Sequence, residues 1–123
     1  MKKGNDPRHQ KRIRLMKFLF EKSFRKDLHI SKDSPENQIL SKQKEIDKLI
    51  AQNAPAWPID QISPVDLATL RLAIWELLFK KKKEPYKVVV DEAVEIAKEF
   101  GSHSSSSFVN GVLGSIITAS KQK

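Results

Sequence analysis

The sequence predicts an all-α protein that forms one compact domain or two small halves sharing a core. Apolar residues recur at intervals of three and four along most of the chain, which is the spacing of an amphipathic helix rather than a strand. Three segments open with an Asp-Pro or Ser-Pro pair, a polar cap followed by proline at the first helical position. Of the 123 residues, 39% are apolar, which suffices for a buried core.

The first helix is predicted to run from Pro7, behind the cap residue Asp6, to about Leu28. Residues 1–6 are expected to form a disordered basic arm. Several basic residues fall in the first two turns of this helix, where positive charge opposes the helix macrodipole. A bound ligand is therefore a candidate explanation for them. The apolar stripe of the helix consists of Ile13, Leu15, Met16, Phe18, Leu19, Phe20 and Phe24.

The second helical segment spans residues 34–52 and carries only a sparse apolar stripe. Residues 53–62 contain two prolines, so a loop is predicted there. We expect Trp57 and Ile59 of this loop to fold back onto the core.

The third helix begins at Ser63-Pro64 and is apolar over much of its circumference, so we expect it to lie at the centre of the bundle. The run Lys80–Lys83 follows at its C-terminal end. Cations interact favourably with the helix dipole at that end, and we prefer this explanation of the lysine run. A nucleic-acid-binding patch, second to the basic start of the chain, stays open as the alternative.

The chain after Pro85 returns to helical spacing, and Gly101 is a suitable cap for the end of that helix. The last helix is predicted over residues 106–120. Gly111 and Gly114 lie inside it, and each costs about 1 kcal/mol relative to alanine. Tight contact with another helix, or the approach of a partner, would justify them.

No active site is evident in the sequence. There is no cysteine, which excludes a disulfide framework and any thiolate site. The three histidines do not share a helix at metal-ligand spacing, and no phosphate-cradling loop occurs. The acidic residues within 91–99 are more typical of a solvated face, or of one that meets a basic partner, than of a cation site. We therefore expect a non-enzyme without cofactor or metal. No apolar run approaches the roughly 18 residues of a membrane span.

The distribution of charge is the most informative feature of the composition. Residues 1–26 contain ten basic and two acidic residues, so this segment carries the whole formal net charge of +8. Such asymmetry indicates a polyanionic partner, either nucleic acid or an anionic membrane, although a solvated basic arm that aids solubility is the simpler alternative.

Three motifs then make the C-terminal part specific. Residues 70–77 (LRLAIWEL), 85–98 (PYKVVVDEAVEIAK) and 108–113 (FVNGVL) resemble, in order and spacing, the signatures of the NusB family of transcription antitermination factors. The resemblance extends over about residues 46–119. The opening of the chain is less similar to the family, and the segment between residues 25 and 45 is shorter than is typical.

The resemblance implies an all-helical bundle of two packed subdomains, at about 7–56 and 57–120, with the N-terminal one shortened. It implies an RNA-binding factor that recognises the boxA-type element of ribosomal RNA leaders together with NusE, a small-subunit ribosomal protein. In the cytoplasm, the assembled complex helps RNA polymerase read through terminators.

By position in the motifs, the resemblance also implies site residues. For Phe108, one of the RNA-contacting candidates, a role in core packing stays open as the alternative. The partner-facing candidates are Glu76 and Lys87. The RNA-contacting candidates are Arg8, Lys11, Arg12, Arg14, Phe20 and Phe108.

Two other functions stay open at this point. The chain is alternatively a protein-binding helical module that uses the acidic face within residues 91–99. It is also similar to NusB-like RNA-binding domains that accompany ribosomal RNA modification, since such domains precede ribosomal RNA cytosine methyltransferases.

Overall fold

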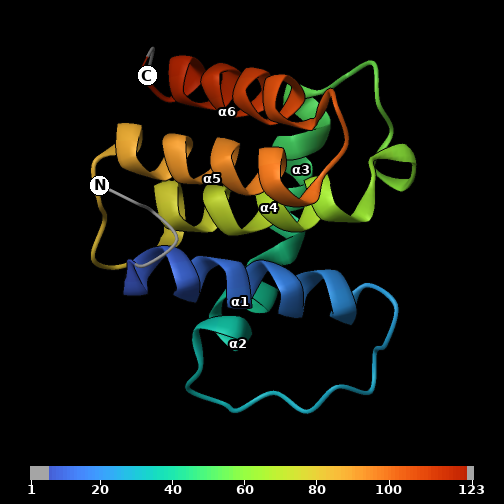
Figure 1. Cartoon of the computed structure of the whole chain (residues 1–123), viewed down its shortest axis with the longest axis vertical. Helices are drawn as coiled ribbons and strands as arrows, with labels where there is room; N and C mark the ends of the chain where they lie inside the picture. The colour runs from blue at the N-terminus through green and yellow to red at the C-terminus, as the bar shows by residue number, and fades with distance from the viewer. Residues whose placement is uncertain (1–5, 122–123) are drawn as a thin grey trace.

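The computed structural model describes residues 6–121. The described part of the chain contains helices and no strand, so the prediction of an all-α protein is confirmed (Figure 1). The predicted arm of residues 1–6 lies outside it except for Asp6. In chain order the elements are α1 (Pro7–Lys22), α2 (Pro35–Ser41), α3 (Gln43–Asn53), the 3₁₀ turn η2 (Ile59–Gln61), α4 (Pro64–Ile74), the π-helical turn η3 (Trp75–Phe79), α5 (Tyr86–Phe100) and α6 (Ser105–Lys121).

Helix α4 is the centre of the bundle, as predicted. Every residue from Asp66 to Ile74 is buried, and α4 contacts α1, α3, α5 and α6. In Figure 1, α4 and α5 lie between α1 and α6. Arg71 of α4 also donates two hydrogen bonds of 2.9 Å to the carboxylate of Asp47, which ties α3 to the centre. None of the helices in the described range is both long enough and apolar enough to cross a membrane.

The three predicted caps are all present. The side chains of Asp6, Ser34 and Ser63 accept hydrogen bonds from backbone N–H groups in the first turns of α1, α2 and α4, respectively. Each satisfies a donor that has no partner within its helix, and proline follows at once. These local signals fix the start of three helices.

Two helix boundaries differ from the prediction. Helix α1 ends at Lys22 rather than near Leu28, because the hydroxyl of Ser23 donates to the carbonyl of Phe20 and competes with the helical pattern. Phe24, predicted in the apolar stripe, is exposed as a result. The segment 34–52 forms two helices that divide at Lys42, just after a serine hydroxyl makes the same kind of backbone bond.

The loop 54–62 buries different residues from those expected. Trp57 is 52% exposed, so its predicted return to the core is wrong, whereas Ile59 packs against the core as predicted. Ala54 and Ile62, at the two ends of the loop, are buried and fill the available core positions.

The glycines of α6 have no helix against them. A Cβ atom added at Gly111 or Gly114 meets no atom within 4 Å, so the expected tight helix–helix contact is wrong. Gly101, by contrast, caps α5 in a crowded position. A Cβ atom there would lie 2.7 Å from the carbonyl oxygen of Ala97 and 2.4 Å from Oγ of Ser105, a fully buried side chain.

We predict opposite effects of alanine at these glycines. Gly101→Ala should lower the free energy of unfolding by about 1–3 kcal/mol, because the added methyl group would clash with the backbone carbonyl of Ala97, which cannot shift without distorting α5. Gly114→Ala should raise the free energy of unfolding by about 1 kcal/mol, because helix propensity improves without a clash. Urea denaturation followed by circular dichroism measures both values. A loss of stability in both variants would contradict the described packing of α6.

Candidate nucleic-acid interface

The cap residue of α1 compensates in part for the basic residues in the first turns of this helix. The backbone N–H of Arg8 donates to Oδ1 of Asp6 at 2.9 Å, and this hydrogen bond is the main reason that the pKa of Asp6 lies below its usual value. An ionised carboxylate at this end interacts favourably with the helix dipole. It therefore offsets part of the unfavourable interaction between the dipole and the cations that follow. The helix can therefore present basic side chains from its first turn.

Arg12 is the buried link between α1 and the rest of the bundle. The residue is only 6% exposed. Its Nε donates to Glu76 Oε2 at 2.9 Å and its Nη2 donates to Glu76 Oε1 at 2.8 Å, a bidentate pair. Its guanidinium also donates to Glu84, and to Glu92 Oε1 at 3.4 Å. Burial alone would lower the pKa of Arg12, but Glu76 first, and then Glu84 and Glu92, outweigh it and raise that pKa.

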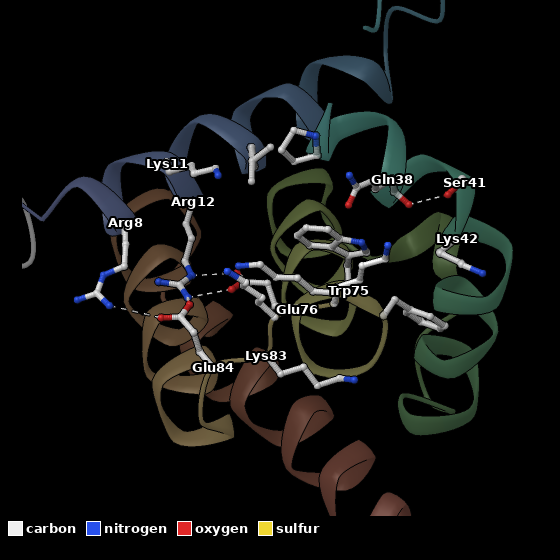
Figure 2. Close-up of a pocket in the computed structure, with 16 residues that line it drawn as sticks. Arg8, Lys11, Arg12, Gln38, Ser41, Lys42, Trp75, Glu76, Lys83 and Glu84 are labelled. Carbon is white, nitrogen blue, oxygen red and sulfur yellow. Dashed lines mark hydrogen bonds and ion pairs between the residues drawn. The ribbon is translucent and has the colours of Figure 1, made fainter. Parts of the chain in front are cut away.

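His9 adds a second buried connection one turn before Arg12. Its Nδ1 lies 2.8 Å from Oε1 of Glu92, and both side chains are buried. We call His9, Arg12, Glu76, Glu84 and Glu92 the ionic latch. The ionic latch joins α1 to η3, to the loop after η3 and to α5 (Figure 2 shows its Arg12, Glu76 and Glu84).

The ionic latch contains two residues that the sequence placed elsewhere. Arg12 was predicted to contact RNA and Glu76 to face a partner, yet the two bind each other in the interior. Sequence reasoning missed the pairing, and it missed His9, Glu84 and Glu92. One signal was available, since His9, Arg12 and Met16 share the buried face of α1, which makes polar groups on that face candidates for a buried pair.

Three other basic residues of α1 point outward. The side chain of Arg8 is 72% exposed, with only loose contacts to Asp6 and Glu84 at 3.7 and 3.8 Å. Lys11 and Arg14 are also exposed. Neither Lys11 nor Arg14 forms an ion pair within residues 6–121. These three side chains are therefore available to an anionic ligand.

The two aromatic candidates do not share a flank with Lys11. Lys11 and Phe20 are nine positions apart, about two and a half helical turns, and so point to opposite sides of α1. Phe20 and Phe108 are half-buried against the core. Phe108 lies in the first turn of α6, which begins at the end of the molecule where α1 ends (Figure 1). Lys87, the other partner-facing candidate, is exposed at the start of α5.

A groove of about 830 Å³ lies beside the N-terminal half of α1. Figure 2 shows Arg8 and Lys11 at one side, Lys42 at the other and Trp75 between them. We call this the basic groove, because eight of its lining residues are basic and two are acidic. Both acidic residues, Glu76 and Glu84, already bind Arg12. The basic groove is lined by Arg8, Lys11, Arg12, Leu15, Pro35, Gln38, Ser41, Lys42, Trp75, Glu76, Phe79, Lys80–Lys83 and Glu84.

Comparison with known proteins gives one consistent family. A model of the NusB family matches residues 34–118, a range that leaves out α1. The transcription antitermination protein NusB of Chloroflexus aggregans is 54% identical over 74 residues, which are 59% of this chain and 49% of that protein. That of Herpetosiphon aurantiacus is 51% identical over 77 residues, which are 61% of this chain and 53% of that protein. The chain thus spans about half the length of the curated relatives it matches.

The structural comparison includes α1 as well. A solved structure of T. maritima NusB superposes with a TM-score of 0.77 and 35% sequence identity, covering 90% of each chain. The likeness of the fold thus reaches well beyond the range that the family model matches.

The ionic latch predicts a large loss of stability when Arg12 alone is removed. Arg12→Met leaves Glu76 buried without its cation and should cost about 3–5 kcal/mol of unfolding free energy. Arg12→Met/Glu76→Gln should recover part of that loss, because no unpaired charge stays buried. Urea denaturation measures both values.

The control is Arg25→Met, which removes an exposed pair with Glu21 and should cost under about 1 kcal/mol. An Arg12→Met variant as stable as this control would show that the ionic latch does not hold α1.

Proposed function

The chain belongs to the NusB family, and from this we propose that it is an RNA-binding transcription antitermination factor. Its RNA is the boxA-type element of ribosomal RNA leaders, bound together with NusE, the small-subunit ribosomal protein. The complex acts with RNA polymerase in the cytoplasm. The protein contributes binding rather than catalysis, within two packed helical subdomains of which the N-terminal one is short.

The observation that carries the proposal is the division of the basic residues on α1. Arg12 is neutralised by buried carboxylates, whereas Arg8, Lys11 and Arg14 project into solvent. Single-stranded RNA is held by neutralisation of its phosphates together with stacking of its bases. We propose that the three exposed side chains contact phosphates. The ionic latch, including Arg12, positions the helix that carries them.

Base stacking is assigned to the far end of the same helix. Arg8 and Phe20 are separated by about 18 Å along α1, from 1.5 Å of rise per residue. Phe20 lies near the end of α1, and α6 begins at the same end of the molecule, with α4 and α5 between the two helices (Figure 1). We propose that RNA running along α1 from Arg8 reaches Phe20 and continues across this end of the molecule to Phe108. Both rings are half-buried against the core, and we propose that the part left exposed stacks on a base.

The NusE partner is assigned to α5. Lys87 is exposed in the first turn, and Asp91 and Glu95 are exposed further along. Glu76 is 4% exposed and pairs with Arg12, so its contribution to a partner would be through the ionic latch.

A titration tests the proposed function directly. A boxA-type RNA labelled with a fluorophore is titrated with the full chain in the presence and absence of NusE. A scrambled RNA of equal length is titrated in the same way as the control. We expect tighter binding of the boxA-type RNA and a further gain with NusE. Equal affinity for both RNAs in both conditions would contradict the proposal.

The salt dependence of RNA binding should identify the contacts on α1. Arg8→Gln/Lys11→Gln should make the slope of log K against log salt less negative by about 1.4, since each phosphate contact on a single strand contributes about 0.7. Lys44→Gln/Lys48→Gln removes the same charge from exposed positions outside the basic groove and should leave the slope unchanged. Equal slopes for the two double variants would remove α1 from the RNA interface.

A further inference from the structure

We propose that the basic groove holds the backbone of single-stranded RNA against Lys80–Lys83, as a second anchorage in addition to Arg8 and Lys11. The proposal rests on the proposed RNA-binding function and adds a contact surface to it. None of these four lysines lies in the three motifs that indicate the family.

The helix dipole does not account for the lysine run. The π-helical turn η3 ends at Phe79, and Lys80 follows in an extended conformation with ψ of 137°. A favourable dipole interaction is confined to the last turn of a helix. Lys81, Lys82 and Lys83 lie beyond that turn, so their charges need another explanation.

The lysine run also lacks an internal counter-charge. Within residues 6–121, Lys81, Lys82 and Lys83 are exposed and form no ion pair. The one acidic residue that follows them directly, Glu84, binds Arg12. Like charges placed in succession repel each other, and an anionic ligand along the run relieves that repulsion.

The other exposed charges around the basic groove have the same sign. Lys11 projects from α1 without an ion pair, and Lys42 forms only an exposed pair with Glu45 at 3.7 Å. Figure 2 shows Lys11, Lys42 and Lys83 around one opening. The basic groove has a volume of about 830 Å³, within the roughly 300–1,000 Å³ of small-molecule sites. This volume is enough for part of an RNA strand but not for a folded partner.

The floor of the basic groove is aromatic and locally irregular. Trp75 is 5% exposed, and Nζ of Lys80 lies 5.9 Å from the centre of its ring. Nζ of Lys42 lies 5.7 Å from the ring centre of the half-buried Phe79. Both rings belong to η3, where the backbone N–H of Lys80 donates to the carbonyl of Trp75. Such π-helical turns are rare and occur frequently at functional sites.

These features favour RNA backbone over a single compact anion. Lysines are flexible point charges without the fixed fork of arginine, and here they are spread along two sides of an open groove. That arrangement tracks a chain of phosphates independently of base sequence. The basic groove is also continuous with Arg8 and Lys11, which are assigned to RNA above.

The test compares two triple variants of the full chain. Lys81→Gln/Lys82→Gln/Lys83→Gln, the lysine-run variant, neutralises the three exposed lysines of the run, and Lys26→Gln/Lys44→Gln/Lys48→Gln removes equal charge from exposed positions that do not line the basic groove. The probe is a boxA-type single-stranded RNA of about 16 nucleotides, the upper end of known single-strand site sizes. Fluorescence anisotropy gives the affinity of each variant over a range of salt concentrations.

The lysine-run variant should bind more weakly than the control, with a slope of log K against log salt less negative by about 2. Equal slopes for the two triple variants, with the unmodified chain still binding RNA, would overturn the second anchorage and leave the proposed function standing. Failure of the unmodified chain to bind RNA would overturn both.

Competition distinguishes RNA from an acidic protein segment. Polyglutamate is added to the preformed complex at the same total charge as unlabelled RNA. We expect RNA to displace the probe from the unmodified chain at far lower concentration. Displacement by polyglutamate as effective as that by RNA would overturn the assignment to RNA and favour an acidic peptide as the occupant.

Discussion

The arrangement of this protein depends on the pairing of Arg12 with Glu76. Both groups are buried, so neither tolerates the loss of the other, and their bidentate geometry allows one position of α1 on η3. Glu84 and Glu92 bind the same guanidinium, and Glu92 also binds His9. The cation within this cluster of carboxylates is therefore a side chain of α1 itself, which fixes the first helix against the elements that follow α4.

That fixation decides which charges of the chain are available. Glu76 and Glu84 are the two acidic residues that line the basic groove, and both are paired with Arg12. No acidic side chain among the lining residues is therefore left to neutralise the lysines of the groove. Arg8, Lys11 and Lys83 lie around the opening of the basic groove (Figure 2), and the other three lysines of the run line it as well. The same interaction thus holds the fold together and leaves a surface of one sign. A surface of this kind attracts an extended polyanion through long-range, salt-dependent forces.

Local signals made much of the fold predictable. Polar caps followed by proline marked the starts of α1, α2 and α4, and the apolar residues around much of the circumference of α4 marked its central place. The end of α1 and the break at Lys42 escaped prediction, since they depend on serine hydroxyls that compete for backbone carbonyls. The site was only partly predictable. A sequence shows that Arg12 is basic, but its burial against Glu76 arises from a contact between residues 64 positions apart.

The most direct measurement is photochemical cross-linking of a thiouridine-containing boxA-type RNA to the chain, in the presence of NusE, with the attached peptides mapped by mass spectrometry. Our account predicts cross-links within α1 and within the lysine run that follows η3. Cross-links confined to α5 and the exposed face of α6, with both of those segments unmodified, would contradict it.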